Sequence, residues 1–314
     1  MLVSLLTDAP KHNLALMKLS AFHKKCGDEV VLNQDMPLFK ADKTYASILF
    51  TKNTRRYYAD EFGGPAFSVR PMGERRGRVC GGKKECEVVF AHLPPDIERM
   101  VPDYSLYSSM GYSLGYTYRP CFRGCDFCVV GKMDHPDVSH HSIWEFHDSK
   151  FRSICLLNNN TFMDAQWKET FEEIWDARLS VVDENGYDLR LLDDEKAEAL
   201  HKTKWVTPLH FAWDRMDDEA AIVRGLGLLR RHHLSSTSNG VYVLIGRDTT
   251  EEDDLHRCQI INDHGLTPYP MPFVKNAYTR SFKRFINLHY YRRYKTIAEA
   301  WSEYGGSLAT KRKP

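Results

Sequence analysis

The pattern of hydrophobic and polar positions predicts that strands and helices alternate along most of the chain. Near its start, an apolar run at residues 3–6 precedes hydrophobic residues at helical spacing between 12 and 26, a pattern typical of a buried strand followed by an amphipathic helix. Apolar runs at 29–32 and 45–50 indicate two more strands. Strands joined in this way favour a parallel α/β layer. We therefore predict a small Rossmann-like α/β domain over residues 1–105.

A longer alternation of strands and helices begins at residue 111. The apolar runs predict six strands, at 111–118, 153–157, 179–182 or 187–191, 208–213, 241–245 and 267–273. Helical patterns separate the later strands, at 163–177, 193–201, 217–233 and 249–264. Six such units suit a partial (β/α)6 barrel of TIM-like type, in which functional residues lie at the carboxyl ends of the strands. We assign residues 106–275 to this domain.

Residues 276–314 form a C-terminal helical tail rich in basic and aromatic residues. Interleaved basic and aromatic side chains are one pattern of nucleic-acid binding. However, Phe282, Phe285, Ile286 and Tyr290 fall on one face of a predicted helix. This spacing favours a buried helix face with solvated arginines over a nucleic-acid surface.

The composition is that of a globular protein, with 42% hydrophobic and 27% charged residues in a chain of 314. A net charge of +1 gives no general attraction to nucleic acid or to a membrane, and no apolar run is long enough to span a bilayer. The first residues lack a basic leader, so we interpret them as a strand rather than a signal peptide. Scattered cysteines favour a reducing compartment, and we expect a cytoplasmic protein; they are Cys26, Cys80, Cys86, Cys155 and Cys258.

The other three cysteines, Cys121, Cys125 and Cys128, lie within eight residues after the first strand of the second domain. Thiolates are soft ligands that suit zinc and iron–sulfur clusters. A C-x3-C-x2-C triplet supplies three of the four ligands that a cubane cluster requires, which leaves one iron open. Gly124 allows the loop to turn tightly. Zinc would require a fourth ligand, for which His135 is the nearest candidate, and three close cysteines cannot all pair as disulfides.

Phe127 directly precedes the third cysteine, and the pattern C-x3-C-x-aromatic-C resembles the signature of the radical S-adenosylmethionine (SAM) superfamily. The resemblance extends from about residue 94 to 273 and implies a [4Fe–4S] cluster whose open iron is chelated by SAM. The implied reaction takes one electron from an external flavodoxin- or ferredoxin-like donor and cleaves SAM reductively. The resulting 5′-deoxyadenosyl radical abstracts hydrogen from a substrate that the sequence does not identify, and this step requires no catalytic base.

The same resemblance implies SAM-binding roles for residues near the strand ends: Phe127, Asn159, Asn160, Arg190, Asp214, Leu244, Gly246 and Met271. Three amides, at residues 158–160, stand where the superfamily commonly has Gly-Gly-Glu or an acidic variant that contacts the SAM amino group. An amide carbonyl would make that contact here. The alternative is an Asx-rich turn that caps the next helix.

The other implied contacts also have structural alternatives. Arg190 is placed to pair with the SAM carboxylate, or else forms a salt bridge with Asp193 or Asp194. Asp214 would accept hydrogen bonds from ribose hydroxyls, or else caps the following helix. Residues 244–246 resemble the segment that packs the adenine ring, although core packing alone would also explain them. Met271 would close the adenine pocket through backbone contacts.

The first domain resembles the cobalamin-binding-type domain of one branch of the superfamily. The cobalt-binding motif Asp-x-His-x-x-Gly is absent, because Asp8 and His12 are wrongly spaced and Asp254-Leu-His256 lacks the glycine. We therefore favour an inherited scaffold or a substrate platform over bound cobalamin. Cys80 and Cys86 have no close second pair with which to hold a metal.

We predict a radical SAM enzyme. The alternative of a different class is an iron–sulfur electron-transfer or sensor protein that does not cleave SAM. A third possibility, a zinc-stabilised binding module, would give a colourless protein. Polar groups at strand ends, such as Asn160 and Arg190, favour the enzyme because an electron carrier has no need for them.

Overall fold

The computed structural model describes residues 1–9, 11–33, 40–68, 88–90, 92–128, 130–132 and 137–310. Cys80, Cys86 and His135 lie outside these residues. The fold is mixed α/β with parallel sheets, which confirms the predicted class. The chain divides into two compact units, residues 1–159 and 160–314, whereas we had placed boundaries near 105 and 275.

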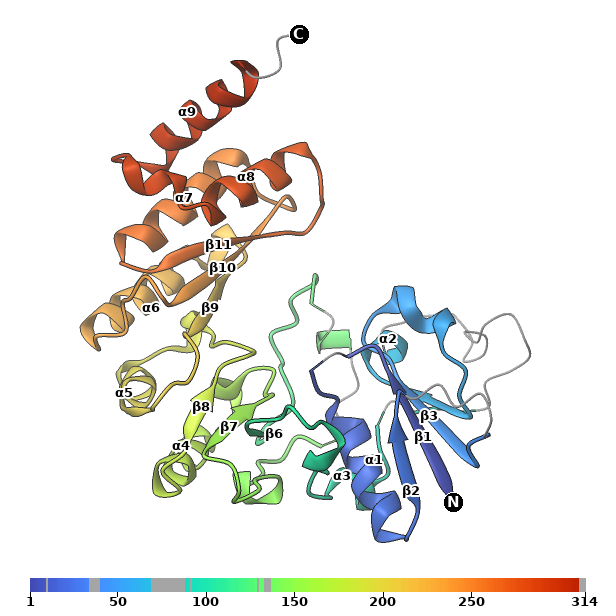
Figure 1. The fold of residues 1–314 in the computed structure, drawn as a ribbon. Helices are drawn as coiled ribbons and strands as arrows, with labels where there is room; N and C mark the ends of the chain where they lie inside the picture. The colour runs from blue at the N-terminus through green and yellow to red at the C-terminus, as the bar shows by residue number, and fades with distance from the viewer. Residues whose placement is uncertain are drawn as a thin grey trace. The chain divides into compact units, whose positions relative to one another are not determined.

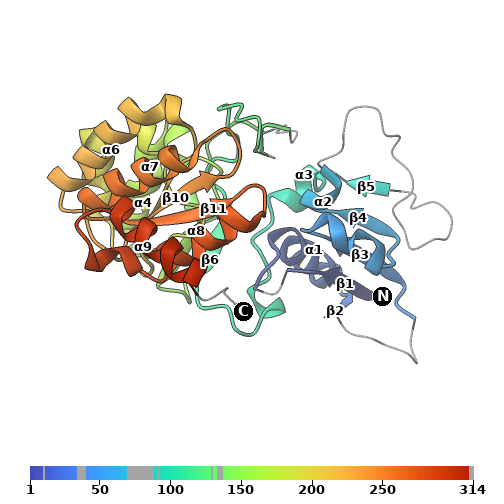
Figure 2. The ribbon, with the colours of Figure 1, turned by 90° about the horizontal axis from the view of Figure 1, so that it is seen from above.

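The first unit is built on a five-stranded parallel sheet in the order β2-β1-β3-β4-β5 (Figure 2). Its strands are β1 (Leu2–Thr7), β2 (Glu29–Leu32), β3 (Lys43–Ser47), β4 (Glu61–Gly63) and β5 (Val88–Phe90). The first three were predicted from their apolar runs. This strand order is one of the two common doubly wound orders, in which the connections reverse direction between β1 and β3.

Helices cover both faces of this sheet. Helix α1 (Leu14–Lys25) begins at Asn13, whose side chain accepts a hydrogen bond from the Leu16 N–H. Together with α3 (Pro95–Glu98), it packs on Val3 and Leu5 of β1 (Figure 1). On the opposite face, Ala46 and Phe62 pack with α2 (Pro65–Ser68). Short 3-10 turns follow at Thr51–Arg56 and Tyr104–Leu106.

Two further strands belong to the first unit and enclose the cysteine loop in the sequence. Strand β6 (Ser113–Gly115) pairs in parallel with β7 (Ser153–Leu156). Their centres, Leu114 and Ile154, are fully buried. Short 3-10 turns lie between them at Val130–Lys132 and Ile143–Glu145. Strand β6 is shorter than predicted.

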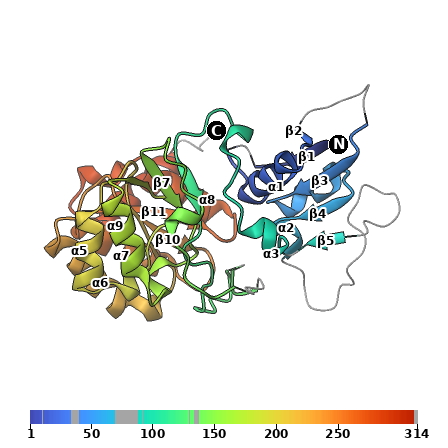
Figure 3. The same cartoon turned by 90° about the horizontal axis from the view of Figure 1, so that it is seen from below.

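The second unit continues the alternation of strands and helices. Its elements are a 3-10 turn (Thr161–Met163), α4 (Trp167–Asp176), β8 (Ser180–Val182), η6 (Leu189–Leu191), α5 (Asp194–Lys202), β9 (His210–Trp213), η7 (Met216–Asp218), α6 (Glu219–Arg231), β10 (Gly240–Ile245), α7 (Glu251–Asp263) and β11 (Thr267–Pro272). Strands β9, β10 and β11 form a parallel sheet with β10 at its centre. Figure 3 shows β10 and β11 beside α7.

The core of the second unit lies on one face of this sheet. Alternate residues of β9 and β10, such as Phe211 and Val243, are buried with apolar residues of α6 and α7. Helices α8 (Ala277–Asn287) and α9 (Ile297–Thr310) follow, joined through a 3-10 turn (Tyr290–Arg293). Phe282, Phe285 and Ile286 of α8 are fully buried. The predicted apolar face of the tail is therefore confirmed for these three residues, whereas Tyr290 lies in the following 3-10 turn and is partly buried.

The described strands do not make a continuous barrel. Among the residues that the structure covers, β9, β10 and β11 form a sheet of their own. The alternative third strand at 187–191 is wrong, because residues 189–191 form the 3-10 helix η6 and only Tyr187 bridges to Phe211. The described part of the chain also has no helix that is long and apolar enough to cross a membrane.

Candidate functional site

The three motif cysteines lie in one loop that follows β6. Cys121, Cys125 and Cys128 are partly exposed thiols, and Phe127 is partly buried beside Cys128. The loop turns through Gly124, whose φ of +62° is a conformation that favours glycine. The Cys128 N–H then donates to the Cys125 carbonyl oxygen over 3.0 Å. The backbone of the cysteine loop therefore forms a tight turn.

The stem of this loop is fixed by the side chain of Asn158, which follows β7. Its Oδ1 accepts hydrogen bonds from the Thr117 and Tyr118 N–H groups over 2.9 and 3.1 Å. Its Nδ2 donates to Thr117 Oγ1 over 2.9 Å. Asn158 is only 2% exposed. A buried amide therefore replaces the backbone pairing that β6 no longer supplies beyond Gly115.

The neighbouring amide of Asn159 reaches the same stem. Its Nδ2 donates to the Arg119 carbonyl oxygen over 2.5 Å, two residues before Cys121. The amides at 158 and 159 hold the backbone that leads into the cysteine loop. The predicted SAM contact of Asn159 would use its Oδ1, which takes no part in the bond to Arg119. Neither amide acts as an Asx cap of α4, because this helix begins only at Trp167.

The donor set of the loop suits an iron–sulfur cluster, since all three candidate ligands are thiols. Within the described residues, no three His, Cys, Asp or Glu side chains are grouped so as to hold a metal ion. A cubane does not require its ligands to meet at one ion, because each cysteine binds a different iron. The chemistry of the three thiols and the open turn at Gly124 are therefore compatible with a cluster.

A second polar group, all within the second unit, surrounds Arg190. Its guanidinium contacts both oxygens of Asp188 at 2.8 and 3.0 Å and Asp218 Oδ2 at 2.8 Å. Burial alone would lower the pKa of Arg190, but these carboxylates outweigh it and raise that pKa. Two aspartates thus bind the guanidinium group that is predicted to pair with the SAM carboxylate. The predicted partners Asp193 and Asp194 are not the ones observed.

Asn160 joins this group through Asp188. Its Nδ2 donates to Asp188 Oδ2 over 3.1 Å. Its Oδ1 is buried and accepts no hydrogen bond from the described residues. A buried carbonyl oxygen without a donor is costly and marks a position where a ligand N–H would be stabilised. Of the three predicted amides, Asn160 is the one whose carbonyl oxygen is buried without a donor among the described residues.

Asp214 follows β9 directly and lies near the same charges. Burial raises the pKa of Asp214 to about 6, although the guanidinium groups of Arg190 and Arg257 act to lower it. It is not the cap of the next helix, because α6 begins at Glu219 after Asp218. An acidic group with this pKa at the carboxyl end of a strand is typical of a functional site.

Leu244 and Met271, both predicted to contact adenine, lie on neighbouring strands. They are register partners on β10 and β11, and both lie on the face of the sheet opposite the buried core. Met271 is 41% exposed. Gly246, at the end of β10, has a φ of +74°, and an added Cβ would lie 2.5 Å from Thr279 Cγ2. A side chain is excluded at this turn for structural reasons.

In the first unit, Asp8 lies where the sheet connections reverse, at the carboxyl ends of β1 and β3. Its carboxylate accepts from the Leu49 and Phe50 N–H groups and from Asn53 Nδ2, at 2.7, 3.1 and 2.8 Å. Burial would raise the pKa of Asp8, but these hydrogen bonds outweigh it and lower that pKa. Doubly wound sheets bind ligands at this point. In this protein, the carboxylate of Asp8 already binds the hydrogen-bond donors at this point.

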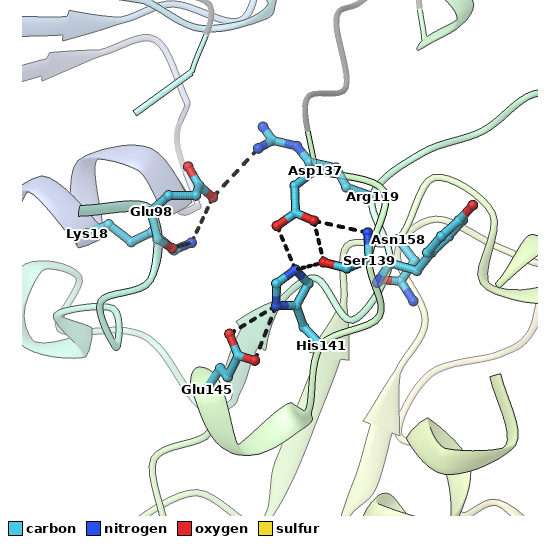
Figure 4. Close-up of polar contacts among 9 residues, drawn as sticks. Lys18, Glu98, Arg119, Asp137, Ser139, His141, Glu145 and Asn158 are labelled. Atoms are coloured by element: carbon cyan, nitrogen blue, oxygen red, sulfur yellow. Dashed lines mark hydrogen bonds and ion pairs between the residues drawn. The ribbon is translucent and has the colours of Figure 1, made fainter. Parts of the chain in front are cut away.

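A further polar cluster surrounds His141, which belongs to none of the motifs recognised in the sequence. His141 Nε2 lies 2.8 Å from Asp137 Oδ2, and Nδ1 lies 3.1 Å from Glu145 Oε2 (Figure 4). Its backbone N–H donates to the Thr117 carbonyl oxygen over 2.8 Å. The signal for this cluster was the spacing of four residues on either side of His141.

Comparison with known proteins gives no match: no protein-family model fits the chain, and no curated protein or solved structure is significantly similar to it.

Proposed function

We propose that this protein is a radical SAM enzyme whose [4Fe–4S] cluster is held by Cys121, Cys125 and Cys128. The observation that carries the proposal is the cysteine loop itself. It combines three thiols at the C-x3-C-x2-C spacing, an aromatic residue before the third cysteine, and a tight turn at Gly124. Six strands, β6 to β11, of which the last five are each followed by an α-helix, support a partial (β/α)6 arrangement as the catalytic scaffold.

The chain's own residues would hold and orient the reactants. When bound, the cluster would supply one electron for the cleavage of SAM into methionine and a 5′-deoxyadenosyl radical, and this radical would take a hydrogen atom from the substrate. Asn158 and Asn159 would fix the stem of the cysteine loop, and with it the direction in which the loop presents its thiols. Asn160 Oδ1 would accept from the SAM amino group, because it is buried and has no donor among the described residues.

The second unit offers further groups that would contact SAM. Asp214 would accept from ribose hydroxyls, and Leu244 with Met271 would pack on the adenine ring. Arg190 would reach the SAM carboxylate only if that carboxylate displaced Asp218, the partner bound through a single guanidinium nitrogen. We propose a cytoplasmic location, with an external flavodoxin- or ferredoxin-like protein as the electron donor.

The test is anaerobic reconstitution with iron and sulfide, followed by reduction and electron paramagnetic resonance with and without SAM. Release of 5′-deoxyadenosine is measured on the same sample. We expect a cluster signal that changes on addition of SAM, together with 5′-deoxyadenosine. Both should be lost in Cys125→Ala and retained in Cys26→Ala, since Cys26 is an exposed thiol outside the loop.

The alternative function is an iron–sulfur electron-transfer or sensor protein. It predicts a cluster signal that SAM does not change and no 5′-deoxyadenosine. That outcome would overturn the enzyme proposal, although the proposal that the cysteine loop holds a cluster would stand. Failure of the wild-type protein to take up iron and sulfide would overturn both the enzyme proposal and the electron-transfer alternative.

A further inference from the structure

The first unit contains a cavity of about 300 Å³ beside the stem of the cysteine loop. Its walls come from α1, the segment around α3, the end of β6 and residues 137–146. Leu93, Pro95, Tyr116 and Phe146 give it an apolar lining. This volume lies at the lower end of the range of small-molecule sites.

The acidic groups of this cavity already have partners within the protein. Lys18 Nζ contacts Glu98 Oε1 at 2.8 Å. Asp137 and Glu145 both lie within hydrogen-bond distance of the His141 ring, and the Ser139 hydroxyl also donates to Asp137 (Figure 4). The carboxylates that line the cavity are therefore largely paired with side chains of the protein itself.

Arg119 is different, because its guanidinium has donors to spare. Its carbon lies 4.9 Å from the centre of the Tyr116 ring. Its nearest carboxylate oxygen, on Glu98, is 3.6 Å from Nη1, which is too long for a hydrogen bond. The guanidinium donates no hydrogen bond to any residue that the structure describes, although its side chain is only 30% exposed. A ligand that enters this cavity would be stabilised most by an acceptor facing Arg119.

We propose that the cavity binds a small organic carboxylate. Its carboxylate pairs with the guanidinium fork of Arg119, and its apolar body lies against Tyr116 and Phe146. A single negative charge fits better than a phosphate dianion, because the three carboxylates of the lining already offset its three basic side chains, Lys18, Arg99 and Arg119. This site is separate from the proposed SAM contacts, and the inference does not depend on the proposed enzyme activity.

The test uses the full-length protein, purified anaerobically, and fluorine NMR titrations with three probes of similar shape. These are 4-fluorobenzoate, 4-fluorobenzyl alcohol and 4-fluorobenzylamine, which carry a negative, a neutral and a positive group. We expect saturable binding of the benzoate, about tenfold tighter than that of the alcohol or the amine, since one charge-assisted pair distinguishes them. Equal binding of the three probes, or no saturable benzoate binding, would overturn the proposal.

Two substitutions with opposite expected effects identify the site. Arg119→Gln should weaken benzoate binding about tenfold and leave alcohol binding unchanged. Glu98→Gln should tighten benzoate binding about threefold, because it removes the internal carboxylate that competes for Arg119 and Lys18. Loss of folding cannot imitate an increase in affinity. Arg152→Gln, an exposed arginine outside the cavity, serves as the control. Unchanged benzoate affinity in Arg119→Gln, or weaker binding in Glu98→Gln, would contradict the assignment.

Discussion

The side chain of Asn158 forms three hydrogen bonds with residues 117 and 118, of which two involve Thr117. Asn158 follows β7, and Thr117 lies between β6 and the first motif cysteine. The amide thus connects the end of one strand to the stem of the loop that follows its neighbour. The direction in which the cysteine loop leaves the sheet depends on this buried polar contact.

Substitution of Asn158 by alanine should therefore destabilise the first unit. It leaves two backbone N–H groups and one hydroxyl without their buried partner, and we expect a loss of about 2–4 kcal/mol in the free energy of unfolding. Asn158→Asp keeps the oxygen that accepts from both N–H groups and should lose less. Urea denaturation of the three proteins measures the difference.

The control for this prediction is Asn159→Ala, which removes a single hydrogen bond to the Arg119 carbonyl oxygen. It should cost about 1 kcal/mol. Iron content after reconstitution provides a second readout, which should fall further in Asn158→Ala than in Asn159→Ala if the stem orients the thiols. Equal stability of wild type and Asn158→Ala would show that the contact is not structural.

Arg190 is predicted to be a stabilising residue whether or not it contacts SAM. In Arg190→Gln, the nearly buried carboxylate of Asp188 loses its bidentate partner, and Asp218 loses its ion pair. We expect a loss of about 2–4 kcal/mol, measured by urea denaturation. The matched control is Arg231→Gln, because the Arg231–Asp194 pair is exposed on both sides and should contribute less than about 1 kcal/mol. Similar losses in both variants would contradict the role assigned to the Arg190 group.

The arrangement of strands and helices could be predicted because it is encoded locally. Runs of apolar residues and helical spacing are properties of neighbouring positions, and β1, β7, β10 and α1 were predicted from them within a few residues. The segment 187–191 was ambiguous for the same reason, since five residues containing two leucines and a tyrosine fit a strand or a 3-10 turn. Asp188 decides this case, because its side chain accepts from the Arg190 N–H and caps the turn.

The polar contacts of the candidate site could not be predicted, because they join residues far apart in the sequence. Asn158 and Thr117 are 41 positions apart, and Arg190 and Asp218 are 28 positions apart. The motif cysteines were found because their ligand spacing lies within one loop. Amides and carboxylates at strand ends were recognised as candidates, but their partners depend on the fold.

Gly246 should tolerate no side chain, and the cause can be divided into two parts. Gly246→Ala would place an L-residue at a φ of +74° and its Cβ 2.5 Å from Thr279 Cγ2. We expect a loss of about 3 kcal/mol from backbone strain and overpacking together. Thr279→Ser removes that methyl group and keeps the hydroxyl that donates to the Val274 carbonyl oxygen.

The double variant Gly246→Ala/Thr279→Ser should therefore recover about 1–2 kcal/mol of the loss, while the strain in φ remains. Thermal or urea denaturation of the two single variants and the double variant completes the cycle. Simple additivity of the two single effects would mean that the close approach to Thr279 relaxes without cost, and that φ alone explains the glycine.

Asp214 should make the stability of the protein depend on pH. Burial raises its pKa from 3.8 to about 6, so between these values the folded protein binds more protons than the unfolded chain. Stability should therefore fall as pH rises through this window and remain lower above it. Asp214→Asn resembles the protonated group and should be more stable than wild type at about pH 7.5. The expected gain is about 2–3 kcal/mol, since each pKa unit corresponds to about 1.4 kcal/mol.

Urea denaturation of both proteins between about pH 4 and pH 8 tests this prediction. Most of the gain in Asp214→Asn should disappear by about pH 4, where the wild-type carboxyl is protonated in the folded state and roughly half protonated in the unfolded state. Asp217→Asn is the matched control, since Asp217 is 82% exposed and should show no such trend. A gain that does not vary with pH would mean that the carboxylate of Asp214 is not penalised by burial. A loss of stability in Asp214→Asn at neutral pH would mean that the folded protein needs the negative charge. Asp214 would then accept a hydrogen bond that is not among the described contacts.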